Sequence, residues 1–231
     1  MIQRKIVAVL FDLDGTLSDR DTAVTRFAVD QYQRMVMPAH TPVPQEEYVK
    51  EFIARDQHGY VHKTIVYQQM CDVLPLKPLV PEVLCADFYA RIRYFQTPMP
   101  SLRPMLNEMH ARGFALGIIT NAGVAMQMDT LDVLGIRADF ASIVISEAVG
   151  MKKPDPAIFL HALQTLHATP DVALFIGDHP VTDIRAAHAV GLRTIWKRVP
   201  YWPAAGVGEQ VIDDLNEIPD IIDRMMSDPD D

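Results

Sequence analysis

Short, uninterrupted runs of apolar residues recur along this chain, with amphipathic stretches between them. Such runs are typical of strands buried on both faces of a parallel sheet, because both sets of alternating side chains then face protein. Four runs are clear, and a fifth at Ser142–Ile145 is weaker. The four clear runs are Ile6–Phe11, Ala115–Thr120, Ala173–Gly177 and Leu192–Trp196. Their alternation with helical stretches predicts an α/β fold, a Rossmann-like parallel sheet with helices on both faces.

The interval between the first two runs breaks this alternation. From about Asp19 to Pro98 the sequence has helical periodicity, with prolines at the breaks and no strand-like run. The helical segments are Thr22–Met35, Gln45–Ala54, Val61–Val73 and Val80–Phe95. An interval of about 80 residues is longer than an ordinary α/β crossover. We therefore predict an all-helical domain at residues 19–98, inserted into a discontinuous core of residues 1–18 and 99–231.

Composition and charge narrow the classes of partner. The chain has 231 residues, of which 49% are apolar, and a net charge of −9. An acidic chain gains nothing from counterion release, so we expect no nucleic-acid partner. No apolar run approaches the ~18 residues of a membrane span, so no membrane partner is expected either. The two cysteines, Cys71 and Cys85, fit free thiols in a reducing compartment. We expect a cytoplasmic protein that is a monomer or a weak homodimer.

Polar residues follow three of the predicted strands, where ligands of open α/β sheets bind. The sequences FDLDGT, TNAG and GDHPVTD supply Asp12, Asp14, Thr120, Asn121, Asp178 and Asp183. A further segment, KKPDP, places Lys153 just before a predicted helix. These side chains are therefore expected to meet at one edge of the sheet.

Several carboxylates at one edge would repel each other, and a divalent cation removes that repulsion. Mg²⁺, which prefers carboxylate and water oxygens, fits best. Asp12 could be a metal ligand or a nucleophile, since carboxylates form aspartyl-phosphates. Asp14 could protonate a leaving oxygen and later activate water. Thr120, the backbone N–H of Asn121 and one lysine could donate to phosphoryl oxygens.

In this order, DLDGT, TN, KPDP and GDHPVTD resemble the four motifs of the haloacid dehalogenase-like hydrolase superfamily. The helical insert resembles that family's C1-type cap. The resemblance implies that Asp12 is the nucleophile and a metal ligand. It implies that Asp14 is the general acid and base, and that its backbone carbonyl also touches the metal.

The same resemblance assigns the remaining motif residues. Thr120 and Asn121 would bind phosphate, and Lys153 would neutralise its charge. Asp178 would be a metal ligand. Asp183 would hold the water shell of the metal or orient Lys153.

These assignments predict a Mg²⁺-dependent phosphomonoester hydrolase that acts on a small phosphorylated metabolite through an aspartyl-phosphate. A phosphomutase of the same superfamily remains an alternative, because the motifs alone do not separate transfer to water from transfer to a sugar. A non-catalytic phospho-accepting or phosphate-binding protein is an alternative of another class. Dehalogenases resemble the first motif without its second aspartate, so Asp14 disfavours that reaction.

Substrate choice is expected to come from the insert. The core motifs contact the phosphoryl group and the metal, which every phosphate ester shares. A polar stretch, ARDQHGYVHK, lies between two predicted helices of the insert. We take Arg55, His58 and Lys63 from this stretch as candidates for substrate specificity.

Overall fold

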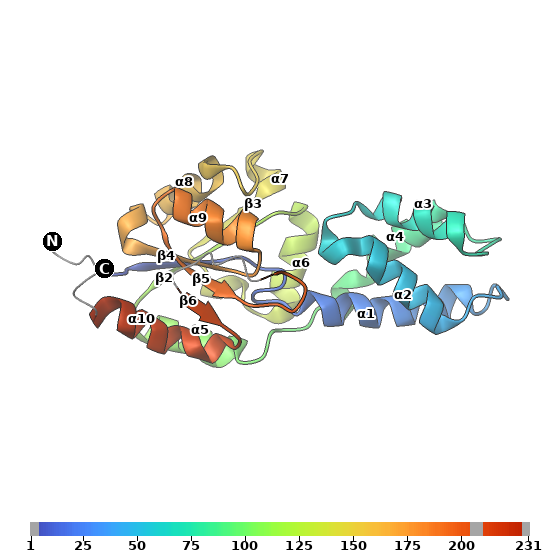
Figure 1. The fold of residues 1–231 in the computed structure, drawn as a ribbon, viewed down its shortest axis with the longest axis horizontal. Coiled ribbons are helices and arrows are strands. Elements are labelled where there is room, and N and C mark those ends of the chain that lie inside the picture. The colour runs from blue at the N-terminus through green and yellow to red at the C-terminus, as the bar shows by residue number, and fades with distance from the viewer. Residues whose placement is uncertain (1–4, 204–209, 228–231) are drawn as a thin grey trace. The chain divides into compact units, whose positions relative to one another are not determined.

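The chain divides into two compact units, residues 1–18 with 98–231 and residues 19–97 (Figure 1). The computed structural model describes residues 5–203 and 210–227. The second junction lies one residue before the limit expected from the sequence. Within the described ranges, no helix combines the length and the apolar character needed to cross a bilayer.

The first unit contains a parallel sheet in the strand order β3-β2-β1-β4-β5-β6. Its strands are β1 Ala8–Phe11, β2 Ala115–Thr120, β3 Ser142–Ile145, β4 Ala173–Gly177, β5 Arg193–Lys197 and β6 Gln210–Ile212. The first five coincide with the predicted runs to within two residues. The sixth was not predicted, because three residues that include a polar Gln210 and a 44% exposed Val211 form no buried apolar run. The DLDGT motif directly follows β1, a central strand of the sheet.

Helices cover both faces of this sheet. They are α5 Leu102–Ala111, α6 Val124–Leu134, α7 Ser146–Val149, α8 Pro156–Thr165, α9 Ala186–Ala189 and α10 Ile218–Ser227. Alternate residues of β1 divide between two apolar clusters. Val9 and Phe11 belong to the cluster that includes α5 and α10, whereas Ala8 and Leu10 belong to the cluster that includes α8 and α9 (Figure 1). The predicted α/β fold with helices on both faces is confirmed.

The second unit, in the residues described, consists of helices and their connections. Its helices are α1 Arg20–Gln31, α2 Gln45–Asp56, α3 Lys63–Val73 and α4 Pro81–Arg91. A π-helical turn follows α1, and a 3₁₀ turn follows α4. Asp19 caps α1, accepting a hydrogen bond of 3.0 Å from the Thr22 amide. The unit has its own apolar core, in which the ring of Phe27 contacts those of Phe52 and Phe88.

A buried ion cluster joins α1, α2 and α3 inside this unit. The Asp56 carboxylate is 2% exposed, and Arg20 donates to it over 2.7 Å. Lys63 forms an ion pair with the same carboxylate, and its Nζ lies 5.0 Å from the centre of the Phe88 ring. Burial by itself raises the pKa of Asp56, but Arg20 and Lys63 outweigh it, so that this pKa lies below its ordinary value. Burial also lowers the pKa of Lys63, an effect that Asp56 opposes and the charge of Arg20 reinforces. Each cation therefore depends on the Asp56 carboxylate as its counter-charge.

The two chain segments that join the units are hydrogen-bonded to each other. Met99 N donates to Leu17 O over 2.9 Å, and Asp19 N donates to Thr97 O over 2.8 Å. Between them, Ser18 and Pro98 form an antiparallel bridge. The exit and the return of the chain therefore run side by side as a short antiparallel ribbon.

Candidate active site

The carboxyl ends of β1, β2 and β4 meet at one edge, because these strands are adjacent and parallel. Asp12 extends the ladder of β1 by donating its amide to Ile176 O over 2.8 Å. The chain then turns at Gly15, where φ is +90°. A Cβ at Gly15 would lie 2.6 Å from Oδ2 of Asp178. Glycine is therefore needed here for the backbone conformation and for the close approach to Asp178.

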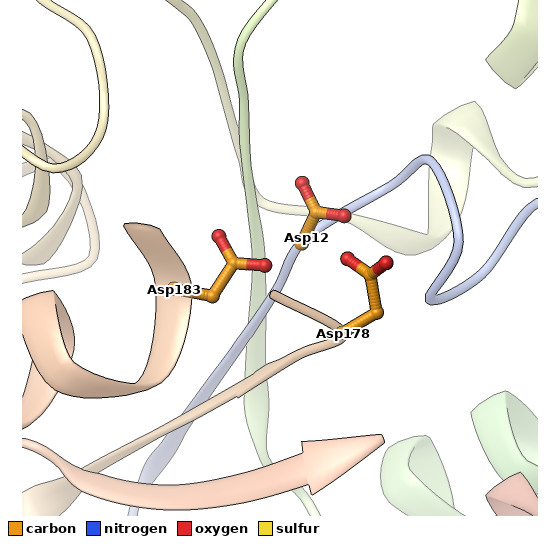
Figure 2. A group of neighbouring side chains, drawn as sticks. All are labelled: Asp12, Asp178 and Asp183. Carbon is orange, nitrogen blue, oxygen red and sulfur yellow. The ribbon is translucent and has the colours of Figure 1, made fainter. Parts of the chain in front are cut away.

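Three buried carboxylates converge at this edge: Asp12 after β1, Asp178 after β4, and Asp183 in the π-helical segment that follows (Figure 2). One oxygen of each lies within 4.8 Å of the others. Their exposed fractions are 6%, 7% and 1%. The structure thus brings together three of the four predicted metal-binding residues by their side chains.

One lysine faces these carboxylates. Lys153 Nζ lies 2.6 Å from Oδ1 of Asp12 and 2.7 Å from Oδ1 of Asp183, and the residue is 4% exposed. Burial alone lowers the pKa of Lys153, but Asp12 and Asp183 outweigh it and raise that pKa above its ordinary value. The ammonium is therefore charged at neutral pH, and it is the partner of two carboxylates.

The carboxylates remain short of positive charge even with Lys153. Burial raises the pKa of Asp12, which Lys153 opposes and Asp183 reinforces. Burial also raises the pKa of Asp178, and the charges of Asp12 and Asp183 add to that effect. Holding all three groups ionised is unfavourable without further positive charge.

This donor set fits a hard divalent cation. Three carboxylates with one ammonium leave negative charge unbalanced in a buried place, and oxygen donors are what Mg²⁺ prefers. Asp14 does not join the group by its side chain, whose carboxylate is bound by Gln127. A contribution of Asp14 to metal binding would have to come from its backbone carbonyl, as the sequence resemblance implies.

Neighbouring groups fix the positions of the carboxylates. Trp196 Nε1 donates to Asp178 O over 2.6 Å, which anchors the backbone at the end of β4. The amide of His179 donates to Oδ2 of Asp183 over 3.1 Å. A Cβ at Gly177 would lie 2.6 Å from the same Asp183 oxygen. Tight packing against the β4 backbone therefore sets the place of Asp183.

The side chain of Asn121 is hydrogen-bonded to the backbone of Lys153. Its Nδ2 donates to Lys153 O over 2.8 Å, and its Oδ1 accepts from Lys153 N over 2.9 Å. This double hydrogen bond ties the end of β2 to the segment that carries Lys153. The predicted phosphate contact of Asn121, which uses its backbone N–H, stays a prediction.

Gln127, on the first turn of α6, belongs to the site and was not predicted from the sequence. Its Nε2 donates to Oδ2 of Asp14 over 2.7 Å and to Oγ1 of Thr120 over 2.8 Å. It is 1% exposed. The sequence around it, VAMQMD, contains no motif that marks a polar site residue. Only the fold brings it to Asp14, which lies 113 positions away along the chain.

A family model for haloacid dehalogenase-like hydrolases matches residues 9–197. The chain belongs to this family. Among curated relatives, a glyceraldehyde 3-phosphate phosphatase of Methanopyrus kandleri is 30% identical over 82% of this chain and 83% of its own length. An N-acetylmuramic acid 6-phosphate phosphatase of Pseudomonas aeruginosa is 28% identical over 99% of this chain and 100% of its own. The solved structure of a HAD phosphatase from Thermococcus onnurineus aligns with a TM-score of 0.67 at 23% identity, covering 94% of this chain and 98% of that one.

The membership confirms the resemblance that the four motifs carry. It also confirms that the chain is a hydrolase of the haloacid dehalogenase-like type. The matched segment runs from β1 to the end of β5, so that it contains every motif residue of the site.

The three candidates for substrate specificity are all engaged within the insert. Each is paired with an acidic side chain of that unit: Arg55 with Glu51, His58 with Asp21, and Lys63 with Asp56. Lys63 is buried, whereas Arg55 and His58 are partly exposed. A role of these residues toward a substrate stays a prediction, and the ion cluster already gives Lys63 a structural task.

Proposed function

We propose that this hydrolase is a Mg²⁺-dependent phosphatase that passes the phosphoryl group of a small phosphorylated metabolite to Asp12 and then to water. The observation that carries the proposal is the buried group of Asp12, Asp178 and Asp183, which among the described residues has ion pairs with Lys153 alone. Such a group needs a cation, and the cation with Lys153 would attract an anionic phosphate. The names of the curated relatives, which are phosphatases of small phosphorylated compounds, support the same class.

In the first step, a carboxylate oxygen of Asp12 attacks phosphorus, and the bond from phosphorus to the leaving oxygen breaks. Asp14 gives its proton to that oxygen. Lys153, Thr120 and the backbone N–H of Asn121 bind the non-bridging phosphoryl oxygens. A bound Mg²⁺, held by Asp12, Asp178 and Asp183, would offset the charge that builds up on these oxygens.

In the second step, Asp14 takes a proton from a water molecule whose oxygen attacks phosphorus. The bond between phosphorus and Asp12 breaks, which releases inorganic phosphate and restores the carboxylate. Asp14 thus returns to its protonated form with a proton from water, which replaces the proton that departed with the leaving group. The ion pairs of Lys153 with Asp12 and Asp183 keep the nucleophile in place throughout.

Release of inorganic phosphate from p-nitrophenyl phosphate tests this proposal. We expect steady turnover with Mg²⁺ and none after exhaustive chelation. Beryllium fluoride is expected to attach to Asp12, which mass spectrometry or a crystal structure would locate. A phosphomutase would release little phosphate in the steady state, and a binding protein none. A screen of phosphorylated metabolites then identifies the substrate.

We further propose that the insert selects the leaving group. The core residues named above reach only the phosphoryl group and the cation, which all candidate substrates share. The relatives are named for different substrates, which fits a common chemistry with variable selection. The polar segment that carries Arg55 and His58 is the part of the insert whose exchange tests this.

A further inference from the structure

The side chain of Gln127 joins Asp14 to Thr120 at the end of β2. It donates from a single nitrogen to Asp14 Oδ2 at 2.7 Å and to Thr120 Oγ1 at 2.8 Å. Among the described residues its Oε1 has no hydrogen-bond partner, although the atom is buried. A glutamine with a purely structural role is expected to satisfy both ends of its amide. Here both hydrogen bonds come from Nε2, the end of the amide that contacts Asp14 and Thr120.

The chemistry of the partners fixes which way the amide points. Oδ2 of Asp14 accepts from the Gln127 nitrogen whether the carboxyl group is ionised or carries its proton on the other oxygen, so the nitrogen faces Asp14. The opposite orientation would place the amide oxygen against a carboxylate oxygen. The Thr120 hydroxyl then accepts the second N–H and keeps its own proton for another acceptor, such as a phosphoryl oxygen.

The start of α6 is itself held rigidly. Glu147 on α7 accepts a hydrogen bond of 2.7 Å from Val124 N, one of the first amides of α6. Ser146 donates to Ala122 O over 3.3 Å, just before the helix. Gln127 lies one turn further along, so that its backbone is fixed relative to β2 and β3. A fixed backbone and two hydrogen bonds leave the amide a single orientation.

We propose that Gln127 is a positioning residue that aims the Asp14 carboxyl group at the leaving oxygen and locks it to the Thr120 hydroxyl. This inference rests on the proposed function, since it assigns a residue to the acid step of that reaction. The carboxyl group of Asp14, three residues beyond the end of β1, has rotational freedom about its own side chain. Because Oδ2 is bound to Gln127, Oδ1 is the oxygen that would carry the proton for the leaving group. Loss of the amide therefore slows proton transfer without removing the acid.

The test compares phenyl phosphate with p-nitrophenyl phosphate. The two esters have nearly the same shape, but phenolate is a much stronger base and needs protonation as it leaves, whereas p-nitrophenolate does not. The ratio kcat/KM includes only the steps up to departure of the leaving group. For Gln127→Met we expect kcat/KM for phenyl phosphate to fall about tenfold to 100-fold, within the range that acid catalysis supplies. The value for p-nitrophenyl phosphate should change by no more than about threefold, since its departure needs little acid.

Two further single variants and one double variant test this interpretation. Gln127→Glu keeps the size of the side chain but places an acceptor against Asp14, so it should produce the same selective loss. Thr130→Val removes a buried hydroxyl elsewhere on α6, which donates to Met126 O within the same helix, and should leave both substrates unaffected. In an Asp14→Asn background, adding Gln127→Met should cost less than about threefold more, because residues that act through one group are not additive.

The outcomes separate the two proposals. Equal loss of kcat/KM for both esters, or full additivity with Asp14→Asn, would mean that Gln127 only supports the fold, and would overturn this inference while leaving the phosphatase intact. Failure of the unmodified protein to release phosphate from either ester would overturn the proposed function itself. Thermal unfolding of each variant shows whether the fold survives.

Discussion

The molecule contains two buried clusters of charged side chains, and they are balanced in opposite ways. In the sheet unit, three carboxylates face one ammonium, that of Lys153. In the helical unit, the single carboxylate of Asp56 faces the two cations of Arg20 and Lys63. The pKa of Asp12 is raised by its burial, whereas the pKa of Asp56 is lowered because Arg20 and Lys63 outweigh its burial.

The difference separates a functional cluster from a structural one. A buried carboxylate with enough cations around it stays ionised and holds helices together. A buried group with surplus negative charge is unfavourable by itself and becomes favourable only when it binds something positive. The imbalance at the edge of the sheet is therefore better evidence of function than burial or charge alone.

Replacement of the nucleophile should give the largest effect. Asp12→Asn is expected to lower kcat for p-nitrophenyl phosphate by at least about 10⁴-fold, since loss of a covalent nucleophile removes most of the catalytic gain. The metal-free protein should become no less stable, because one of three crowded negative charges is removed while Lys153 keeps Asp183 as a partner. Turnover and thermal unfolding in EDTA check both halves. A strong loss of stability would show that Asp12 also has a structural role.

In the insert, by contrast, removal of a buried carboxylate is expected to destabilise the fold. Asp56→Asn leaves the buried Lys63 and the partly buried Arg20 without a counter-charge, and should lower the free energy of unfolding by about 3–5 kcal/mol. Chemical denaturation measures this change. Lys63→Met added to Asp56→Asn should restore part of the loss, because it removes one unpaired cation and keeps apolar contact with Phe88. An unchanged denaturation midpoint in the single variant would contradict a structural role for the cluster.

The pH dependence of stability sharpens this test. The pKa of Asp56 in the folded chain lies below its ordinary value of 3.8. Its stabilising contribution is therefore complete above that value and is lost as the pH falls through the lowered folded pKa. The difference in unfolding free energy between the natural protein and Asp56→Asn should shrink over the same acidic range.

A cation should stabilise the site that is short of positive charge. Saturating Mg²⁺ at about 100 times its dissociation constant is expected to raise the free energy of unfolding by about 2.7 kcal/mol. Thermal unfolding with and without Mg²⁺ measures this effect in the absence of substrate. Asp178→Asn should abolish the shift, whereas Asp56→Asn should leave it in place. A shift that persists in Asp178→Asn would place the cation elsewhere.

The smallest effects are expected from two partly exposed polar groups of the insert. Arg55→Ala and His58→Ala should change the ranking of metabolite substrates, with a cost of about 1.5–3 kcal/mol for any substrate that bonds to the lost charge. Hydrolysis of p-nitrophenyl phosphate should stay within several-fold of the unsubstituted enzyme. An unchanged ranking in both variants would discard these residues as specificity determinants.

Sequence patterns predict the features of the structure that are determined by residues close together along the chain. The runs that became β1 to β5 and the motif residues Asp12, Lys153 and Asp178 are marked by local sequence. The partners of these residues are not. Gln127 is polar and lies on a helix with no motif, and the amide contacts of Asn121 depend on a segment 32 positions away. Pairings of this kind are fixed only when strands and helices pack.

The ribbon that joins the two units has a consequence for how enzymes of this kind can diversify. The two ends of the insert are held together by the hydrogen bonds of the ribbon itself, between Met99 and Leu17 and between Asp19 and Thr97. With respect to the sheet unit, residues 19–97 are therefore a loop whose two ends are already joined. Since the entropy of closing a loop rises only slowly with its length, one such segment can be exchanged for another, longer or shorter, with little penalty to the core. Grafting at this ribbon would give new substrate selection to an unchanged catalytic edge.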